Sequence, residues 1–378
     1  MKIIHTSDWH LGKKTEGKSR LEEQRLALDE LCELAKSAKA DAVIAAGDIF
    51  DTVNPSAEAE ELFYSYCLKL SRTCPVIAVA GNHDNPERLN APRGIAGECG
   101  VLLCGGMDDS RAKEPFCGGE GFVTLRKGTE RVNFALLPYP SSARMSALGY
   151  VPDPEKSYAE NVREWLAVCA RGFTASDCNI TVSHLFMEKS ERASDEAELG
   201  TAALLPLGVL PDAHYTALGH VHKPQCVSKS RSVYYSGSLL RYSFDDTSEK
   251  FFNVLNTSAA GVKLEKVRIE SGKKLVTVQA ESFDEAMRAL KENADAYVRI
   301  LYNSPQPLSA GRYAEMRAEQ SFAAFRSVYV SPEIKRAARR LRSDGEYFSD
   351  YYKLGHDGEE PPRELLEMFE KAMRGEEL

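Results

Sequence analysis

The chain has 378 residues, of which 43% are hydrophobic and 28% charged, a composition typical of a soluble globular protein with one large domain and smaller additions. It contains no run of about 20 apolar residues, which excludes a helix that spans a membrane. The net charge of −8 argues against a general affinity for polyanions, so any contact with nucleic acid must come from local patches or from a partner.

The first third of the chain alternates short apolar segments with amphipathic ones. Strands are predicted at 2–5, 42–46 and 75–80, and helices at 19–39 and after Ser56, which can cap the second helix. This order is typical of a parallel sheet covered by helices. The second helix carries an apolar stripe that either packs on the core alone or also forms a dimer interface. The stripe consists of Leu62, Phe63, Tyr66 and Leu70.

The middle of the chain is richer in strands. Two apolar or alternating segments, 121–125 and 132–137, precede a helix predicted at 158–170. The later strands are predicted at 179–183, 215–218, 233–235, 251–256 and 262–269. The nine cysteines are scattered without a CxxC pair, and the first apolar segment starts at Met1, which leaves no room for a signal peptide. Reduced thiols and a cytoplasmic location are therefore expected.

Five clusters of polar residues each follow a predicted strand, and together they contain five of the eight histidines. In sheets of this kind, sites form outside the carboxyl ends of the strands, so we expect the clusters to meet. They are Asp8-Trp9-His10, Gly47-Asp48, Gly81-Asn82-His83-Asp84, Ser183-His184 and Gly219-His220-Val221-His222.

Imidazole, carboxylate and amide donors in one place predict a centre for two divalent metal ions, the arrangement that many phosphodiester hydrolases use. Asp48 follows the middle of the three N-terminal strands and is predicted to bridge the ions. The mixed donor set suits Mn²⁺, Fe²⁺ or Zn²⁺ better than Ca²⁺. The remaining predicted ligands are Asp8, His10 and His222 for one ion, and Asn82, His184 and His220 for the other.

His83 cannot easily bind a metal beside Asn82 if the backbone is regular. We expect it to face the substrate, where it can donate a proton or stabilise charge, and we expect Asp84 to orient it. Asp51 either supports the site or is merely a turn residue. The three other histidines match none of these motifs and are predicted to be structural: His5, His214 and His356.

The motifs DxH, GD, GNHD, SH and GHxH in this order resemble those of the calcineurin-like metallophosphoesterases. Longer stretches at 5–12, 46–51, 217–225 and 235–238 resemble the SbcD family, the nuclease subunits of bacterial SbcCD complexes. The resemblance covers about residues 1–257. It implies a four-layer α/β fold, in which two sheets form a β-sandwich flanked by helices, with a small capping domain and a helical tail.

The family resemblance also implies activity and partners. It implies a DNA exonuclease and endonuclease in repair and recombination, with two Mn²⁺ ions, or Fe²⁺, Zn²⁺ or Mg²⁺ in their place. It further implies a homodimer that binds SbcC, an SMC-like coiled-coil ATPase, through the tail. The assembly would then be a heterotetramer, located in the cytoplasm at the nucleoid.

The segment Ser271-Gly272-Lys273-Lys274 marks a boundary, so the predicted domains are 1–271, 272–332 and 333–378. The last segment is too rich in aromatic residues for a free tail and is predicted to dock a partner. Its basic stretch from Lys335 to Arg342 is either a solvated face or a DNA or partner patch. In the second domain, strands are predicted at 275–278, 297–302 and 327–330, and helices at 283–293 and 310–318.

One motif points to a different chemistry. Residues 12–19 match the phosphate-binding pattern GxxxxGK[ST]. However, such a loop starts directly after its strand, whereas residues 7–11 intervene here, and Glu16 would face the phosphates. The segment is better interpreted as a basic loop available to DNA phosphates, through Lys13, Lys14, Lys18 and Arg20. Arg88 and Arg93, beyond the GNHD motif, either contact DNA or lie on the surface.

Two other functions of the same fold stay open at this point. The chain could be a phosphodiesterase or phosphatase for small molecules, but such an enzyme needs neither a capping segment nor an aromatic tail. It could also be a scaffold without catalytic activity, but an intact set of metal ligands is unexpected in a scaffold.

Overall fold

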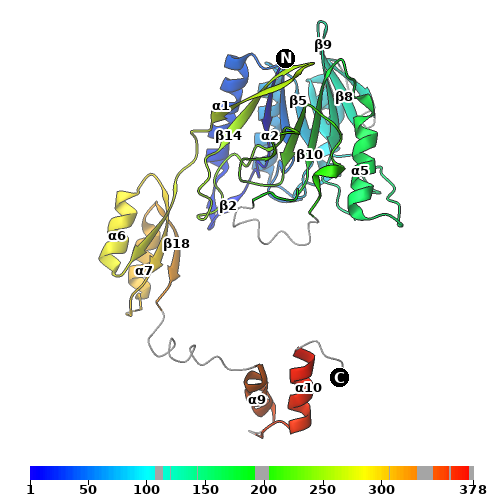
Figure 1. The fold of residues 1–378 in the computed structure, drawn as a ribbon. Coiled ribbons are helices and arrows are strands. Elements are labelled where there is room, and N and C mark those ends of the chain that lie inside the picture. Colours follow the sequence, from blue (N-terminus) through cyan, green and yellow to red (C-terminus); the bar gives the residue numbers. More distant parts are fainter. Residues whose placement is uncertain are drawn as a thin grey trace.

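The computed structural model describes residues 1–106, 114–119, 121–142, 144–191, 204–305, 307–329, 344–356 and 359–373. Two stacked β-sheets form the main body, and helices cover the outer face of each sheet (Figure 1). The four-layer α/β architecture expected from the sequence is therefore confirmed. None of the helices in the described part of the chain combines the length and apolar character that a membrane crossing requires.

The first sheet has six strands in the order β15-β14-β1-β4-β5-β6. Its parallel part consists of β1 (Lys2–Thr6), β4 (Ala42–Ala46), β5 (Val76–Val79) and β6 (Val101–Cys104), and its antiparallel edge of β14 (Phe251–Ser258) and β15 (Gly261–Arg268). The helices in this part of the chain are α1 (Leu21–Ala38), α2 (Ala57–Ser71), α3 (Pro86–Asn90) and α4 (Arg93–Glu98). Ser56 caps α2 by accepting the amide of Ala59, as the sequence predicted.

The second sheet has seven strands in the order β12-β13-β11-β10-β9-β8-β7. Its four parallel strands are β9 (Glu130–Leu137), β10 (Cys178–His184), β11 (Tyr215–Gly219) and β13 (Val233–Tyr235). Its antiparallel strands are β7 (Phe116–Gly119), β8 (Phe122–Lys127) and β12 (Gln225–Ser228). The outer face is covered by α5 (Tyr158–Cys169) and by the short helices η1 (Ala170–Gly172) and η3 (Leu207–Val209).

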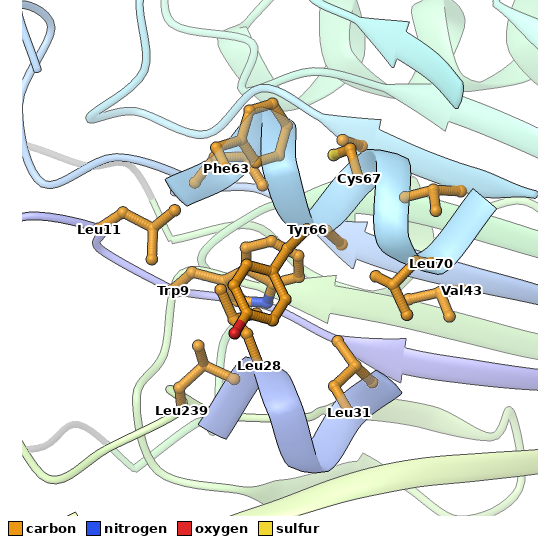
Figure 2. Close-up of a cluster of buried hydrophobic side chains, with 14 of the residues drawn as sticks. Trp9, Leu11, Leu28, Leu31, Val43, Phe63, Tyr66, Cys67, Leu70 and Leu239 are labelled. Atoms are coloured by element: carbon orange, nitrogen blue, oxygen red, sulfur yellow. The ribbon is translucent and has the colours of Figure 1, made fainter. Parts of the chain in front are cut away.

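Alternation along the strands builds a separate apolar core between each pair of layers. In β4, Val43 faces α1 and α2, whereas Ile44 faces the second sheet. Figure 2 shows side chains of α2 meeting those of α1 over the first sheet. Phe63, Tyr66 and Leu70 of the predicted stripe are buried there, so this part of the stripe belongs to the core. All nine cysteines lie in the described residues, and none of them forms a disulfide.

The segment that matches a phosphate-binding loop forms a small hairpin instead. Its strands are β2 (Lys14–Thr15) and β3 (Lys18–Ser19), which pair antiparallel. Glu16 and Gly17 make the turn with φ angles of 47° and 78°, the left-handed conformation that two-residue hairpin turns require. Paired strands cannot wrap a phosphate, and this excludes the phosphate-loop interpretation.

The third sheet is separate and has three parallel strands: β16 (Leu275–Ala280), β17 (Tyr297–Tyr302) and β18 (Phe322–Ser327). It carries α6 (Phe283–Glu292) and α7 (Ala310–Ala318). The prediction of a strand at 327–330 was wrong: β18 begins at Phe322 and ends at Ser327. The strand lies earlier in the chain because the Phe322 side chain packs in the core of this unit. Farther along, α9 (Asp344–Gly355) and α10 (Arg363–Met373) pack together, with Phe348 stacked on Phe369 at 4.3 Å. The basic stretch from Lys335 to Arg342 lies outside the described residues.

Candidate metal centre

The seven predicted metal ligands lie at the ends of strands from both large sheets. The first sheet positions four of them after β1, β4 and β5, and the second sheet positions three at the ends of β10 and β11. We call these seven side chains the candidate metal centre, or the centre for short: Asp8, His10, Asp48, Asn82, His184, His220 and His222.

The backbone at this centre is held in an unusual conformation. Asp8, His10, Asp48 and His220 have φ angles of 51°, 45°, 49° and 106°. Residues other than glycine rarely adopt positive φ, and such strain concentrates at functional sites. Four of the seven predicted ligands therefore depend on surrounding contacts to keep their orientation.

One half of the centre is formed by Asp8, His10 and His222, whose ligand atoms all lie within 4.8 Å of one another. The Nε2 atoms of His10 and His222 face each other at 2.9 Å. Two imidazole nitrogens can share one proton in this arrangement, or both lone pairs can bind a cation. All three side chains are buried, as expected for a site that strips water from an ion.

The other half is formed around Asn82. Its Oδ1 lies 2.9 Å from His184 Nε2 and 2.8 Å from His220 Nδ1. Between the two halves lies Asp48, whose Oδ2 is 3.4 Å from His184 Nε2 and 3.5 Å from His10 Nε2. One carboxylate oxygen thus faces a nitrogen of each half, which is the position that a bridging ligand needs.

Burial and neighbouring charges have opposite effects on the pKa values of His184 and Asp48. Burial alone would lower the pKa of His184, but the carboxylates of Asp48 and Asp8 outweigh it and raise the pKa to about 9. Burial would raise the pKa of Asp48, but His184 and His10 hold it well below its usual range. Asp48 therefore stays ionised, and a buried carboxylate needs a positive partner.

These residues fit divalent metal ions. The donors are imidazole nitrogens, carboxylate oxygens and one amide oxygen, the set that binds first-row transition metals. Among the described residues, His10 Nδ1 is also one of three buried polar side-chain atoms without a hydrogen bond; it faces Asp51 Oδ1 at 3.4 Å. That carboxylate is placed to support the ring from behind, as metal-binding histidines require.

His83 lies beside the centre and is partly buried. Its Nδ1 is 2.7 Å from the carbonyl of Asp51, and its amide donates to Asp48 Oδ1 at 2.9 Å. With His10 and Asp48 it also forms a third group of possible ligand atoms within 4.8 Å. The structure thus brings His83 to the centre, within reach of His10 and Asp48.

Asp84 does not orient His83, contrary to the expectation from the sequence. Its buried carboxylate accepts the amides of Ile49, Phe50 and Gly81 at 3.1, 2.9 and 2.7 Å, while the Asp51 carbonyl contacts the His83 ring. Burial and the nearby Asp48 raise the pKa of Asp84 to about 6. Asp84 therefore ties the loop after β4 to the loop after β5.

The structure excludes one of the six predicted DNA contacts, and the other five remain predictions. Arg20 is fully buried and binds Glu23 with two N–H groups, so it cannot reach DNA, and that expectation was wrong. Arg88 is exposed but paired with Glu60 at 2.7 Å. The expectation remains a prediction for the others, of which Lys14 is exposed, Lys18 and Arg93 are partly exposed, and Lys13 pairs with Asp51 at 3.0 Å.

Several residues around the centre were missed from the sequence because they belong to none of the motifs. Gln24 and Tyr242 bond to the loop after β1, and Tyr139 stacks on His220 with ring centroids 5.9 Å apart. Arg144 donates to the carbonyls of Gly81 and Asn82, at 3.2 Å each. Asp51, left open from the sequence, did carry a signal there, as the last residue of the motif Gly47-Asp-Ile-Phe-Asp51.

Comparison with known proteins is consistent with this geometry. The model of the calcineurin-like phosphoesterase family matches residues 1–224. SbcD, a component of the nuclease SbcCD of Bacillus subtilis (strain 168), is 32% identical over 395 aligned residues, which cover 100% of this chain and 99% of that protein.

Solved structures give more distant matches. GAP50, an anchor in the inner membrane complex of Plasmodium, is 14% identical, with a TM-score of 0.46 over 72% of this chain and 86% of that one. A dimetal phosphatase from Danio rerio is 13% identical, with a TM-score of 0.42 over 72% of this chain and 99% of that one.

Proposed function

Because the chain belongs to the calcineurin-like phosphoesterase family and, within it, to the SbcD family, we propose that it is a DNA nuclease that works with two divalent metal ions. A metal-dependent phosphoesterase activity follows from the family and the candidate metal centre. DNA as the substrate is supported by the relative, which is part of a nuclease. The observation that carries the proposal is the convergence of seven donor side chains from two sheets.

Each half of the centre would hold one ion, with Asp48 between them. When bound, divalent ions supply an activated water and stabilise the negative charge that develops on the phosphate. Asn82 contributes a neutral oxygen, which keeps negative charge away from the incoming phosphate. We propose Mn²⁺ as the working ion, with Fe²⁺, Zn²⁺ or Mg²⁺ as alternatives, because the donor set mixes nitrogen and oxygen.

His83 is the proposed acid of the reaction. The Asp51 carbonyl can only accept a hydrogen bond, so the proton of the neutral ring lies on Nδ1. His83 can then exchange a second proton at Nε2 with the oxygen that leaves the phosphorus. Asp84 acts indirectly, by fixing the loops that carry Asp48 and His83.

The remaining parts of the chain are proposed to serve DNA and partner binding. Residues 1–271 would form the nuclease domain, 272–332 a capping domain over the DNA, and 333–378 the segment that docks SbcC, an SMC-like ATPase. Tyr347 and Tyr351 on α9 and Met368 on α10 are 61%, 75% and 50% exposed, and exposed aromatic and apolar side chains fit a docking role. The exonuclease and endonuclease activities and the location at the nucleoid in the cytoplasm follow from the same proposal.

A homodimer is proposed through the outer face of α2 and α4. Leu68 on α2 and Ile95 on α4 are 46% and 78% exposed, whereas Phe63, Tyr66 and Leu70 of the predicted stripe are buried. Two nuclease subunits and two ATPase subunits would then form a heterotetramer.

The test compares two substrates. Linear duplex DNA and bis-p-nitrophenyl phosphate are each assayed with Mn²⁺ and with EDTA. We expect cleavage of DNA in Mn²⁺ only, lost in Asp48→Asn and kept in the control Asp295→Asn, an exposed position in the third sheet's unit. Cleavage of the small ester alone would indicate a small-molecule phosphodiesterase, and cleavage of neither substrate would indicate a scaffold.

A further inference from the structure

Gln24 is fully buried in α1 and bonds to the loop that carries Asp8 and His10. Its Nε2 donates to the carbonyls of Trp9 at 3.1 Å and His10 at 2.7 Å, and its Oε1 accepts the amide of Gly12 at 3.1 Å. His10 has a φ of 45°, and these bonds prevent its loop from relaxing. Gln24 thereby keeps the His10 ring directed at His222.

Tyr242 contacts the same loop and Gln24 itself. Its hydroxyl donates to the carbonyl of Trp9 at 2.5 Å and lies 2.8 Å from Gln24 Nε2, whose two hydrogens are shared among this oxygen and the carbonyls of Trp9 and His10. Its ring lies edge-on to His10 and His222, with centroids 5.9 and 6.2 Å away. A movement of Tyr242 would therefore shift the carbonyl of Trp9, the residue before His10. It would also shift the ring that His10 and His222 contact.

Arg20 lies one turn before Gln24 and connects Tyr242 to the third sheet. Its guanidinium group lies 5.8 Å from the centre of the Tyr242 ring and 5.4 Å from that of Tyr297 in β17. It also donates to Thr15 Oγ1 and to the carbonyl of Arg241. The Glu23 carboxylate binds this guanidinium group with two hydrogen bonds, and the two rings contact it as well. A shift of one ring therefore disturbs a buried cation that the other ring also contacts.

The interface between the third sheet and the body contains few apolar side chains. Its apolar part is a cluster of Phe244, Tyr297 and Ala323, and a carboxylate of Asp245 binds Arg299 at 2.6 Å. Interfaces with few apolar contacts allow one domain to move against another. Tyr297 belongs to β17, so it would move together with the third sheet.

We propose that Arg20 and Tyr242 form a buried link through which the position of the third sheet sets the metal affinity of the centre. Gln24 and Tyr242 are the positioning residues for His10. The inference rests on the proposed role of His10 as a metal ligand. Any partner that displaces the third sheet would then change metal binding without touching the centre.

The test is calorimetric titration of Mn²⁺ into the full, metal-free chain. Tyr242→Phe removes one hydroxyl and should weaken binding about tenfold, the effect typical of groups that support metal ligands.

Tyr297→Leu removes the ring over Arg20 and should weaken binding about fivefold, a typical coupling between distant sites. Tyr297→Phe keeps the ring over Arg20 and removes only the hydroxyl beside Glu23, so it should bind Mn²⁺ more tightly than Tyr297→Leu. The matched control is Tyr313→Leu, whose ring contacts Phe322 and Phe325 within the third sheet's unit, and it should bind like the wild type.

The double variant distinguishes a link from two separate effects. If Tyr297 acts through Tyr242, Tyr242→Phe combined with Tyr297→Leu should lose about tenfold, not the product of both losses. Additive losses, or equal affinities for Tyr297→Leu and Tyr297→Phe, would overturn the link. A different result would show that His10 is not a metal ligand: His10→Ala would then bind Mn²⁺ with the wild-type affinity and stoichiometry.

Discussion

At the scale of single residues, backbone groups contact the predicted ligands as well as the side chains do. His184 Nδ1 lies 3.0 Å from the carbonyl of Ala46, and Asp8 Oδ1 accepts the amide of His220. In the metal-free chain the ring, whose pKa is raised to about 9, carries a proton on each nitrogen. The carbonyl holds the proton on Nδ1, so Nε2 is the nitrogen that would lose its proton to bind a metal ion. The metal-binding tautomer of His184 is therefore set by the end of β4, a neighbouring strand in the other sheet.

The first prediction concerns His83. His83→Ala should retain two bound ions per chain and lose at least about a hundredfold in DNA hydrolysis, because the ring acts on the leaving oxygen. Metal content by inductively coupled plasma mass spectrometry and the rate of DNA cleavage would be measured on the same sample. Loss of an ion from the variant would show instead that His83 is a ligand, together with His10 and Asp48.

The second prediction concerns His5, which is buried between the two sheets with its nitrogens 3.1 Å from the Tyr215 hydroxyl and 3.2 Å from the Leu218 carbonyl. Burial lowers the pKa of His5 to about 3. Below pH 6.5, His5 is protonated in the unfolded chain but stays neutral in the native chain. The free energy of unfolding therefore falls as the pH falls, by about 1.4 kcal/mol per pH unit. Above pH 6.5 the residue has no such effect.

His5→Gln keeps polar groups at this position and removes the titration. Between pH 7 and pH 5 the wild type should lose about 2 kcal/mol more stability than the variant. Urea unfolding in EDTA would measure this, since the histidines of the centre then contribute equally to both proteins. Parallel pH curves would show that His5 is not held neutral by the fold.

At the scale of elements, glycines let the two sheets approach each other at the candidate metal centre. A Cβ atom on Gly219, at the end of β11, would lie 1.9 Å from the carbonyl oxygen of Ala46 in β4 and 2.8 Å from His184 Nδ1. Such distances cannot occur, so an added methyl group must push the strand ends apart. The two halves of the centre can therefore lie this close together only because residue 219 is a glycine.

The third prediction follows from this contact. Gly219→Ala should lower the free energy of unfolding by about 1–3 kcal/mol, as overpacking typically does, and should weaken Mn²⁺ binding. Gly208→Ala is the matched control, because a Cβ there meets no atom within 4 Å. Denaturant unfolding and metal titration on both variants would test the claim, which fails if the two behave alike.

The elements also show what the sequence can and cannot predict. Strand ends that carry Asp, Asn and His were predictable, because an apolar run followed by such residues is a local pattern. The role of Asp84 was not, since it depends on how the loops after β4 and β5 meet. Arg20 was misassigned for the same reason: its neighbours in sequence are basic, but the residues that bury it include Tyr242 and Tyr297, more than 200 positions away.

At the scale of the whole molecule, the candidate metal centre joins the two sheets. Asp8, His10, Asp48 and Asn82 come from the first sheet, and the three other histidines come from the second. Ions bound among them would hold the sheets together at one end of the sandwich. In the metal-free chain the buried carboxylate of Asp48 stays charged there, a cost that bound cations would offset.

The last prediction is that Mn²⁺ stabilises the whole fold. An ion that binds only the native state adds about 2.7 kcal/mol to the free energy of unfolding when its concentration is a hundred times the dissociation constant. Scanning calorimetry should therefore show a higher melting temperature in Mn²⁺ than in EDTA, and Asp48→Asn should lose most of the difference, because it removes the carboxylate that faces both halves. Asp295→Asn should keep it. If the melting temperature of the wild type is the same in Mn²⁺ and EDTA, the ions do not join the sheets.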